Sequence, residues 1–144
     1  MEVPILSELK SNGQNPEYLF WIGCAGSFDD RSKKVTRAFV KILNKANISY
    51  AILGKEESCT GDPAKRSGNE FLFQMKAISN IEVLNSYGVK KIITTCPHCF
   101  NTIKNELNCQ SRQQNAHNST YNMHTSDTEK LMDFACKQQC DSGE

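Results

Sequence analysis

Residues 90–100, KKIITTCPHCF, join a β-branched run to a Cys-x-x-Cys pair. The run 92–95 is typical of a buried strand, and helix-like sequence begins directly after it. Cys96 and Cys99 therefore lie where a strand leads into the first turn of a helix. Backbone N–H groups and the helix dipole favour the thiolate form at such a position. The stretch predicts reactive or metal-binding thiols at the carboxyl end of a strand.

Two earlier apolar runs end in a similar way. Residues 18–22 form a continuous apolar run, typical of a strand covered on both faces, and a small-residue loop carrying Cys24 follows it. Residues 48–53 form a second short run, and the polar loop 54–66 after it carries Cys59. Each of these cysteines is therefore also expected just beyond the carboxyl end of a strand.

Between these runs, apolar residues recur at helical spacing. A helix is expected from residue 31, with Arg and Lys on its outer face and an apolar face formed by Val35, Ala38, Phe39, Ile42, Leu43 and Ala46. A long helix is expected before Gly88, and its start is either Asp62-Pro63 or the capping-box sequence Ser67-x-x-Glu70. The apolar side of this long helix is expected to contain Phe71, Met75, Ile78, Ile81 and Leu84. A third helix is expected over residues 97–107.

This alternation of strand and helix predicts an α/β fold. The fold class is a small parallel sheet of three or more strands with flanking helices in Rossmann-like layers, joined by right-handed crossovers. Ligands of open parallel sheets bind at the edge formed by the carboxyl ends of the strands. The thiols of Cys24, Cys59, Cys96 and Cys99 are therefore expected on one rim of one sheet.

Composition divides the chain into three segments. Residues 1–15 are a lead-in segment with one short helical turn, residues 16–107 are the cysteine-rich domain, and residues 108–144 are an atypical tail. Residues 108–118 contain almost nothing apolar, which predicts that the tail is partly disordered. No role is assigned to the remaining cysteines and histidines of the tail, which are Cys109, His117, His124, Cys136 and Cys140.

The charge balance and the cysteine content limit the class of protein. With 17 basic and 16 acidic residues the net charge is +1, which gives no reason to expect nucleic acid or an anionic membrane as partner. No apolar run approaches the roughly 20 residues of a membrane span, and the N-terminus lacks the features of a signal peptide. Seven cysteines without an export signal indicate metal or redox function in a reducing compartment, so the cytoplasm is the expected location.

Four convergent thiolates suit an iron–sulfur cluster or a structural zinc ion. In one alternative, Cys24 and Cys59 are ordinary buried thiols and only Cys96 and Cys99 are reactive. In a second alternative, Cys96 and Cys99 form a thioredoxin-like dithiol, which leaves Cys24 and Cys59 unexplained. His98 lies between the two thiols of the Cys-x-x-Cys pair. It is either a metal ligand or proton carrier, or a solvated residue of the first helical turn, and the solvated interpretation is favoured.

These motifs resemble the cysteine-rich "CCG" domain of iron–sulfur oxidoreductases. That family includes the B subunit of heterodisulfide reductase, the C subunit of anaerobic glycerol-3-phosphate dehydrogenase and lactate-utilisation proteins. The resemblance covers residues 16–107 and rests on Gly23-Cys24, Ser58-Cys59-Thr60-Gly61 and Cys96-Pro97-His98-Cys99. The phrases FWIGCAGSFDDR and TCPHCFNT are similar to heterodisulfide-reductase-type subunits in particular.

The resemblance implies that Cys24, Cys59, Cys96 and Cys99 bind one iron–sulfur cluster. It implies a redox subunit that transfers electrons between a flavoprotein or ferredoxin-like partner subunit and a substrate such as a disulfide or a 2-hydroxy acid. Whether the chain is an enzyme by itself is left open.

Three departures from the family pattern widen the range of functions. Ser58 replaces one cysteine of the family's Cys-Cys doublet, so a noncubane [4Fe–4S] cluster, an ordinary [4Fe–4S] cluster and zinc are all open. The family usually has two such domains in tandem and this chain has one, and its tail follows the family weakly. The alternative functions are therefore a zinc-binding scaffold or partner-binding domain, and an inactive truncation product.

Overall fold

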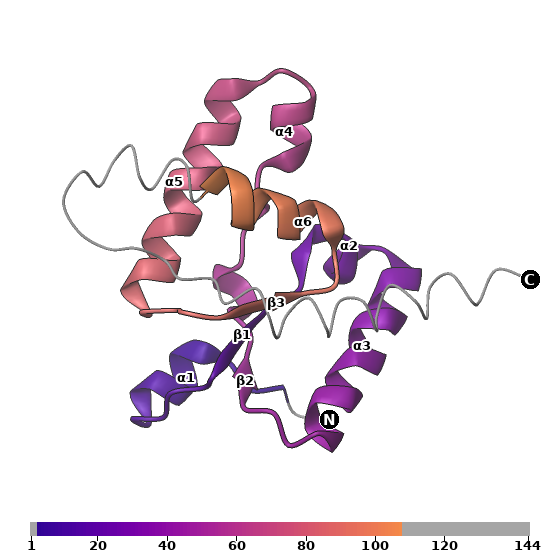
Figure 1. The fold of residues 1–144 in the computed structure, drawn as a ribbon, viewed down its shortest axis with the longest axis vertical. Coiled ribbons are helices and arrows are strands. Elements are labelled where there is room, and N and C mark those ends of the chain that lie inside the picture. The colour runs from indigo at the N-terminus through magenta and orange to yellow at the C-terminus, as the bar shows by residue number, and fades with distance from the viewer. Residues whose placement is uncertain (1–2, 108–144) are drawn as a thin grey trace, which may run out of the picture.

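A computed structural model of the chain describes residues 3–107, so the predictions for residues 108–144 lie outside the described residues. Three strands and several helices follow one another along the chain (Figure 1). Their order is α1 Leu6–Ser11, β1 Tyr18–Trp21, α2 Gly23–Phe28, α3 Asp30–Lys45, β2 Tyr50–Ala51, the 3-10 turn η1 Gly54–Glu56, α4 Asp62–Arg66, α5 Glu70–Ser86, β3 Ile92–Thr94, α6 Pro97–Asn101 and the wider helical turn η2 Thr102–Leu107.

The three strands form one parallel sheet in the order β2-β1-β3, which confirms the predicted α/β fold. Strand β1 is central, as its continuous apolar run predicted, because both of its edges pair with a neighbour and both of its faces are covered. Trp21 at the end of β1 lies opposite Thr94 at the end of β3. The chain therefore leaves both strands at the same edge, immediately before the Cys24 and Cys96 segments.

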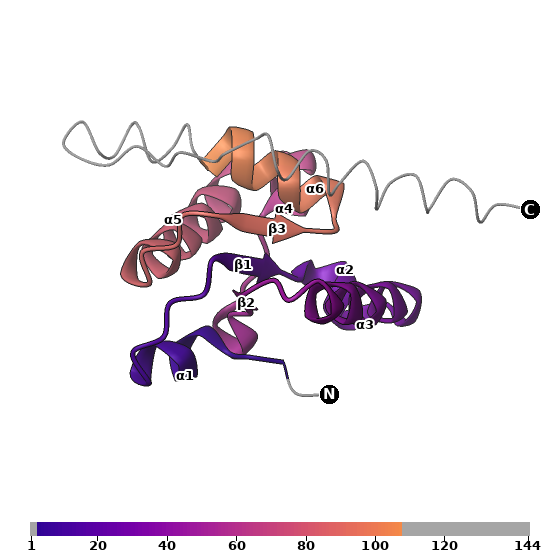
Figure 2. The same ribbon diagram turned by 60° about the horizontal axis from the view of Figure 1, so that its bottom comes forward.

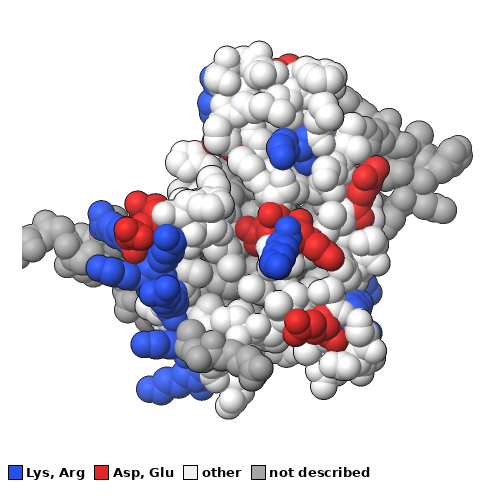
Figure 3. Space-filling model, turned by 180° about the vertical axis from the view of Figure 1, so that it is seen from behind, with Lys and Arg blue, Asp and Glu red and all other residues white. Residues whose placement is uncertain are grey.

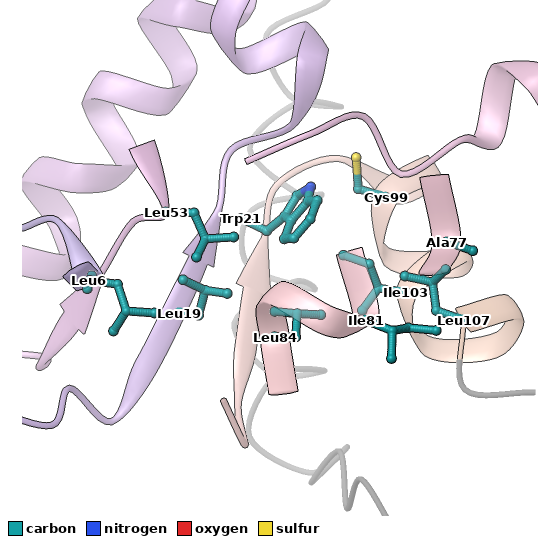
Figure 4. Packing of buried hydrophobic residues seen from close by; sticks show 11 residues of the cluster. Leu6, Leu19, Trp21, Leu53, Ala77, Ile81, Leu84, Cys99, Ile103 and Leu107 are labelled. Carbon is teal, nitrogen blue, oxygen red and sulfur yellow. The ribbon is translucent and has the colours of Figure 1, made fainter. Parts of the chain in front are cut away.

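Helices α3 and α5 cover opposite sides of this sheet (Figures 1 and 2). Phe20 of β1 belongs to a buried cluster with α3, together with Ile93 of β3. Leu19 and Trp21, which alternate with Phe20 along the strand, belong to the other buried cluster, with α5, α6 and η2 (Figure 4). The alternation of side chains along β1 therefore supplies both halves of the core.

Helix α3 begins where the sequence indicated. The side chain of Asp29 accepts a hydrogen bond from the backbone N–H of Ser32 at 2.7 Å, the usual N-cap arrangement. Phe39 and Leu43 are buried, as predicted. Ile42 is exposed, because Thr36 and Val40 complete the inner face in its place.

Helix α5 differs from the prediction in its start and in its inner face. Both predicted start regions are used, because α4 begins at Asp62 and α5 begins at Glu70, but the cap of α5 is Asn69, which accepts from the N–H of Leu72 at 3.0 Å. Phe71 and Met75, expected inside, are 75% and 55% exposed. The apolar sequence at the start of α5 allows two faces, and the buried one is formed by Phe73, Ala77, Asn80, Ile81 and Leu84.

Two further segments depart from the expectations. Residues 23–28, expected as a loop, form the short helix α2, and β2 covers only two residues of the apolar run 48–53. The helical turn predicted in the lead-in segment is α1. Among the helices of residues 3–107, none combines the length and the apolar composition needed to cross a membrane.

Candidate metal centre

The four predicted cysteines all follow the carboxyl ends of strands. Cys24 is exposed in the first turn of α2, directly after β1. Cys59 is half-buried in the loop between η1 and α4, after β2. Cys96 is half-buried at the N-cap of α6, after β3, and Cys99 is buried one turn further on. The strand order reverses at β1, and the crevice at such a reversal is the usual ligand position in an open parallel sheet.

The thiols of Cys96 and Cys99 interact directly. A hydrogen bond from the Cys99 thiol, together with the backbone N–H of Cys99, lowers the pKa of Cys96 to about 5 although partial burial opposes this. The same interaction and burial raise the pKa of Cys99. The hydroxyl of buried Thr60 acts in the opposite sense on the pKa of Cys99. Cys96 is therefore the thiol that ionises first, as expected at a helix N-terminus.

Cys24 shares the electrostatic environment of the other cysteines. Burial raises the pKa of Cys24, and the charges of Cys59 and Cys96 raise it further. The charge of Cys24 in turn contributes to the raised pKa of Cys99. Thiolates that repel one another in this way are stabilised by a cation or an iron–sulfur cluster, because thiolate is the form that binds such metals.

Gly23 lets β1 approach the Cys-x-x-Cys helix closely. Its φ of +77° lies in the left-handed region, and a Cβ built at this position would be 2.9 Å from the Sγ of Cys99. Glycine is therefore required here both for its backbone conformation and for its lack of a side chain.

The Cys59 loop is held from helix α5. The buried side chain of Asn80 donates to the carbonyl oxygen of Cys59 at 2.9 Å. The backbone N–H of Gly61 points to the Sγ of Cys59 at 3.4 Å, in the geometry of a weak N–H to sulfur hydrogen bond. Gly61 itself has a φ of +88° and lies against the ring of Phe73. Cys59 is thus fixed by contacts that the sequence pattern did not indicate.

Glu57 connects the Cys59 loop to the Cys24 helix. Its carboxylate oxygens accept from the backbone N–H groups of Ile22 at 3.0 Å and Gly23 at 2.6 Å. Burial raises the pKa of Glu57, and these two N–H groups counteract the rise. The bidentate contact joins positions 35 residues apart in sequence, so only the tertiary structure could identify this positioning residue.

Ser58, which stands in the doublet position of the family motif, interacts with a lysine. The ammonium group of Lys76 on α5 donates to the Ser58 hydroxyl at 3.3 Å. A cation therefore lies beside the position where the family pattern has a further thiol.

Trp21 places an unpaired donor next to the rim. Its side chain is only 1% exposed, and its Nε1 has no hydrogen-bond partner among the described residues. Figure 4 shows the indole nitrogen on the edge of the ring that faces toward Cys99. A buried N–H without a partner is costly, and an additional acceptor at this rim would satisfy it.

His98 is exposed on the first turn of α6, in agreement with the solvated interpretation. Within residues 3–107, no group of three or more Cys, His, Asp or Glu side chains is arranged so that it could hold a metal ion. The donor chemistry of the rim nevertheless suits a soft metal centre, because it combines four thiols with buried N–H donors.

Comparison with known families identifies the fold around these cysteines. The family described as "Cysteine-rich domain" (CCG) matches residues 18–104, which contain all four cysteines of the rim. The chain belongs to this CCG family. Its matched region begins at β1 and ends inside η2, so it coincides with the sheet and the helices that surround the rim.

The relatives of the chain include proteins named as oxidoreductases or as a subunit of one. The chain is 53% identical over 98 residues to "EtfAB:quinone oxidoreductase" of Syntrophomonas wolfei, which covers 68% of the chain and 14% of that protein. It is 50% identical over 105 residues to "Probable iron-sulfur-binding oxidoreductase FadF" of Bacillus subtilis, covering 73% and 15%. It is 30% identical over 91 residues to the D subunit of dihydromethanophenazine:CoB--CoM heterodisulfide reductase of Methanosarcina barkeri, covering 61% and 22%.

The chain therefore corresponds to about one seventh of the length of the first two relatives. No solved structure matches it. The relationship establishes that the chain is a CCG-type cysteine-rich domain, related to segments of proteins named as oxidoreductases, and it agrees with the resemblance drawn from the cysteine motifs.

Proposed function

We propose that this domain binds one iron–sulfur cluster through Cys24, Cys59, Cys96 and Cys99 and acts as an electron-transfer unit of an oxidoreductase. The observation that carries the proposal is that all four cysteines lie in the segments that follow the carboxyl ends of the three parallel strands. Membership of the CCG family and relatives described as iron–sulfur proteins support it.

Several described residues each position or activate a different cysteine of the site. The Cys99 thiol and the N–H groups at the start of α6 favour the Cys96 thiolate, and Gly23 admits the close approach of Cys99. Glu57 and Asn80 hold the segments that carry Cys24 and Cys59. A bound cluster supplies one-electron chemistry, whose potential depends on burial and on hydrogen bonds to sulfur. The N–H groups of Gly61 and Trp21 are the donors available here for such bonds.

The cluster type proposed is [4Fe–4S], because four cysteines supply one thiolate to each iron. Ser58 and the neighbouring Lys76 favour the ordinary cubane over the noncubane form, since the additional thiol of the doublet is absent and a cation lies in its vicinity. The proposed partners are a flavoprotein or ferredoxin-like subunit, with a disulfide or a 2-hydroxy acid as the final substrate class. A reducing cytoplasm is the compartment in which such thiols persist.

Anaerobic purification followed by iron, sulfide and zinc analysis tests the proposal. The expected result is a brown protein with about four irons and four sulfides per chain. A colourless protein with one zinc per chain would contradict it and support the zinc scaffold instead. Visible absorbance and electron paramagnetic resonance after dithionite reduction identify the cluster type.

Single serine variants identify the ligands. Cys24→Ser, Cys59→Ser, Cys96→Ser and Cys99→Ser should each lower the iron content per folded chain. Cys109→Ser is the matched control, because this cysteine lies outside the matched family region. An iron content that falls in the control as much as in the four variants would reject the assignment.

A further inference from the structure

Charge is distributed very unevenly over the protein. Helix α3 contains one acidic residue, Asp30, and six basic residues, which are Arg31, Lys33, Lys34, Arg37, Lys41 and Lys45. Its net charge is therefore +5, whereas the whole chain carries a net charge of +1. The whole chain is nearly neutral because the strongly basic helix α3 is balanced by a net negative charge on the remaining residues.

The basic residues of α3 form one continuous stripe. Arg31, Lys34, Arg37, Lys41 and Lys45 follow one another at intervals of three or four residues, the spacing that places side chains on one helix face. The stripe lies on the outer side of the helix, and the opposite face is buried against the sheet. Figure 3 shows the Lys and Arg side chains gathered along the edge of the molecule that α3 forms.

Most of this stripe is not neutralised within the domain. Lys33, which lies beside the stripe, pairs with Asp30 at 3.2 Å, and Arg31 interacts with the carboxylate of Asp29. Among residues 3–107, Lys34, Arg37, Lys41 and Lys45 have no carboxylate within ion-pair distance. Like charges at this spacing repel one another, so a bound polyanion would relieve a repulsion that the fold leaves in place.

The stripe begins beside the proposed cluster site. Helix α2, which carries exposed Cys24, ends at Phe28, and only Asp29 separates it from α3. Phe28 is 81% exposed at this junction. Protein interfaces combine an apolar anchor at the centre with polar or charged side chains around it. Phe28 and the neighbouring cations of α3 provide both parts.

We propose that Phe28 and the basic stripe of α3 form a docking surface for an acidic electron-transfer protein. This inference rests on the proposed function, because it assigns the electron partner to a surface beside Cys24. Charge complementarity would steer the partner to the rim and make the association rate dependent on ionic strength.

An acidic protein fits this surface better than a membrane or a nucleic acid does. The apolar face of α3 is already buried in the core by Phe39, Val40 and Leu43, so the helix has no apolar face to insert into a bilayer. The stripe is also confined to one straight helix, and aromatic side chains that could stack on bases do not alternate with its cations. Anionic vesicles and duplex DNA are therefore the comparison ligands.

The test measures the binding of an acidic flavodoxin to the full chain by fluorescence anisotropy over a series of salt concentrations. The reversal Arg37→Glu/Lys41→Glu is expected to weaken binding at least about tenfold at low salt and to flatten the salt dependence. The matched control is Lys10→Glu/Lys90→Glu, which changes the net charge equally. These two lysines line a hollow of about 470 Å³ beside the amino ends of the strands, at the edge away from the rim. Binding by this control should be close to that of the unmodified chain.

Phe28→Ser provides a second variant, which should weaken binding without changing its salt dependence, because it removes apolar contact only. Equal loss of binding in the Lys10/Lys90 control, or no salt dependence in the unmodified chain, would overturn the proposal. Tighter binding to phosphatidylserine vesicles or to duplex DNA than to flavodoxin would overturn it as well.

The binding measurement does not require a cluster, so it separates this inference from the proposed function. A chain that contains no iron but binds flavodoxin through α3 would retain the docking surface and reject the cluster. A chain with iron and sulfide whose flavodoxin binding is unaffected by Arg37→Glu/Lys41→Glu would retain the cluster and reject the docking surface.

Discussion

The two faces of the sheet have different chemistry. On the α3 side the buried cluster is apolar or aromatic apart from the Tyr50 hydroxyl, and the rings of Phe20 and Phe39 lie 5.2 Å apart between centroids. On the α5 side the core includes the thiol of Cys99 and the unpaired N–H of Trp21, and Asn80 is buried nearby. One face of the sheet therefore mainly stabilises the fold, whereas the other also accommodates polar groups beside the cysteine rim.

The largest expected effect is a loss of stability on the α3 side. Phe39→Ala removes an aromatic side chain from a closely packed cluster and should lower the free energy of unfolding by about 3–5 kcal/mol. Urea denaturation followed by tryptophan fluorescence measures the change. Iron content per folded chain should stay unchanged, and a parallel loss of iron from the folded fraction would show that the two faces are not separable.

Gly23→Ala tests the close approach on the rim. The positive φ and the contact with Cys99 should together lower the free energy of unfolding by about 2–3 kcal/mol and reduce iron retention. Gly13→Ala is the matched control, since Gly13 has a φ of +73° but no atom within 4 Å of the added Cβ. Its cost should be about 1–2 kcal/mol with iron retention unchanged. Equal iron loss in both variants would assign the effect to backbone strain.

Asn80→Leu tests the polar contact between α5 and the Cys59 loop. It keeps the branched shape of the side chain but leaves the Cys59 carbonyl without its donor, which should cost about 1–2 kcal/mol and speed the loss of iron to a chelator. Gln74→Ala on the same helix removes an exposed hydrogen bond to Glu70 and should change stability by less than about 0.5 kcal/mol. Chelator kinetics that are the same in both variants would exclude a role for Asn80 in holding the site.

The smallest expected effect concerns the indole of Trp21. Trp21→Phe removes the unpaired N–H but keeps most of the aromatic packing. If this N–H stabilises the more negative, reduced state by about 1 kcal/mol, its loss lowers a one-electron potential by about 40 mV. Potentiometric titration of the cluster signal measures the shift, and an unchanged potential would exclude a hydrogen bond from Trp21 to the centre.

Local sequence was sufficient to predict the fold class of residues 3–107 and most of its elements. Strand β1 was indicated by a continuous apolar run and α3 by its periodicity, and both signals depend on neighbours close in sequence. The segments that carry the four cysteines followed from topology, since each segment connects a predicted strand to the next helix.

The features that the sequence did not predict depend on tertiary contacts. Ile81 and Leu84 are buried in α5 as predicted. The first two turns of its inner face were predicted wrongly because Phe71 and Met75 are as apolar as Phe73, and only the packing against the Cys59 loop and the sheet selects one face. Glu57 was missed because its partners are two backbone N–H groups far away in sequence. The unpaired N–H of Trp21 could not be predicted from the sequence, because a buried tryptophan ordinarily finds a hydrogen-bond partner.

The parallel pairing of β1 with β3 also has a consequence for folding. Trp21 and Thr94 meet only after the long intervening stretch of chain has been brought into a loop, so this contact is non-local and forms slowly. Cys24 and Cys96 come together at the same step, because each lies a few residues beyond that pair. The thiols of Cys24 and Cys96 therefore stay apart until late in folding, so the proposed cluster would be loaded only after the sheet has closed.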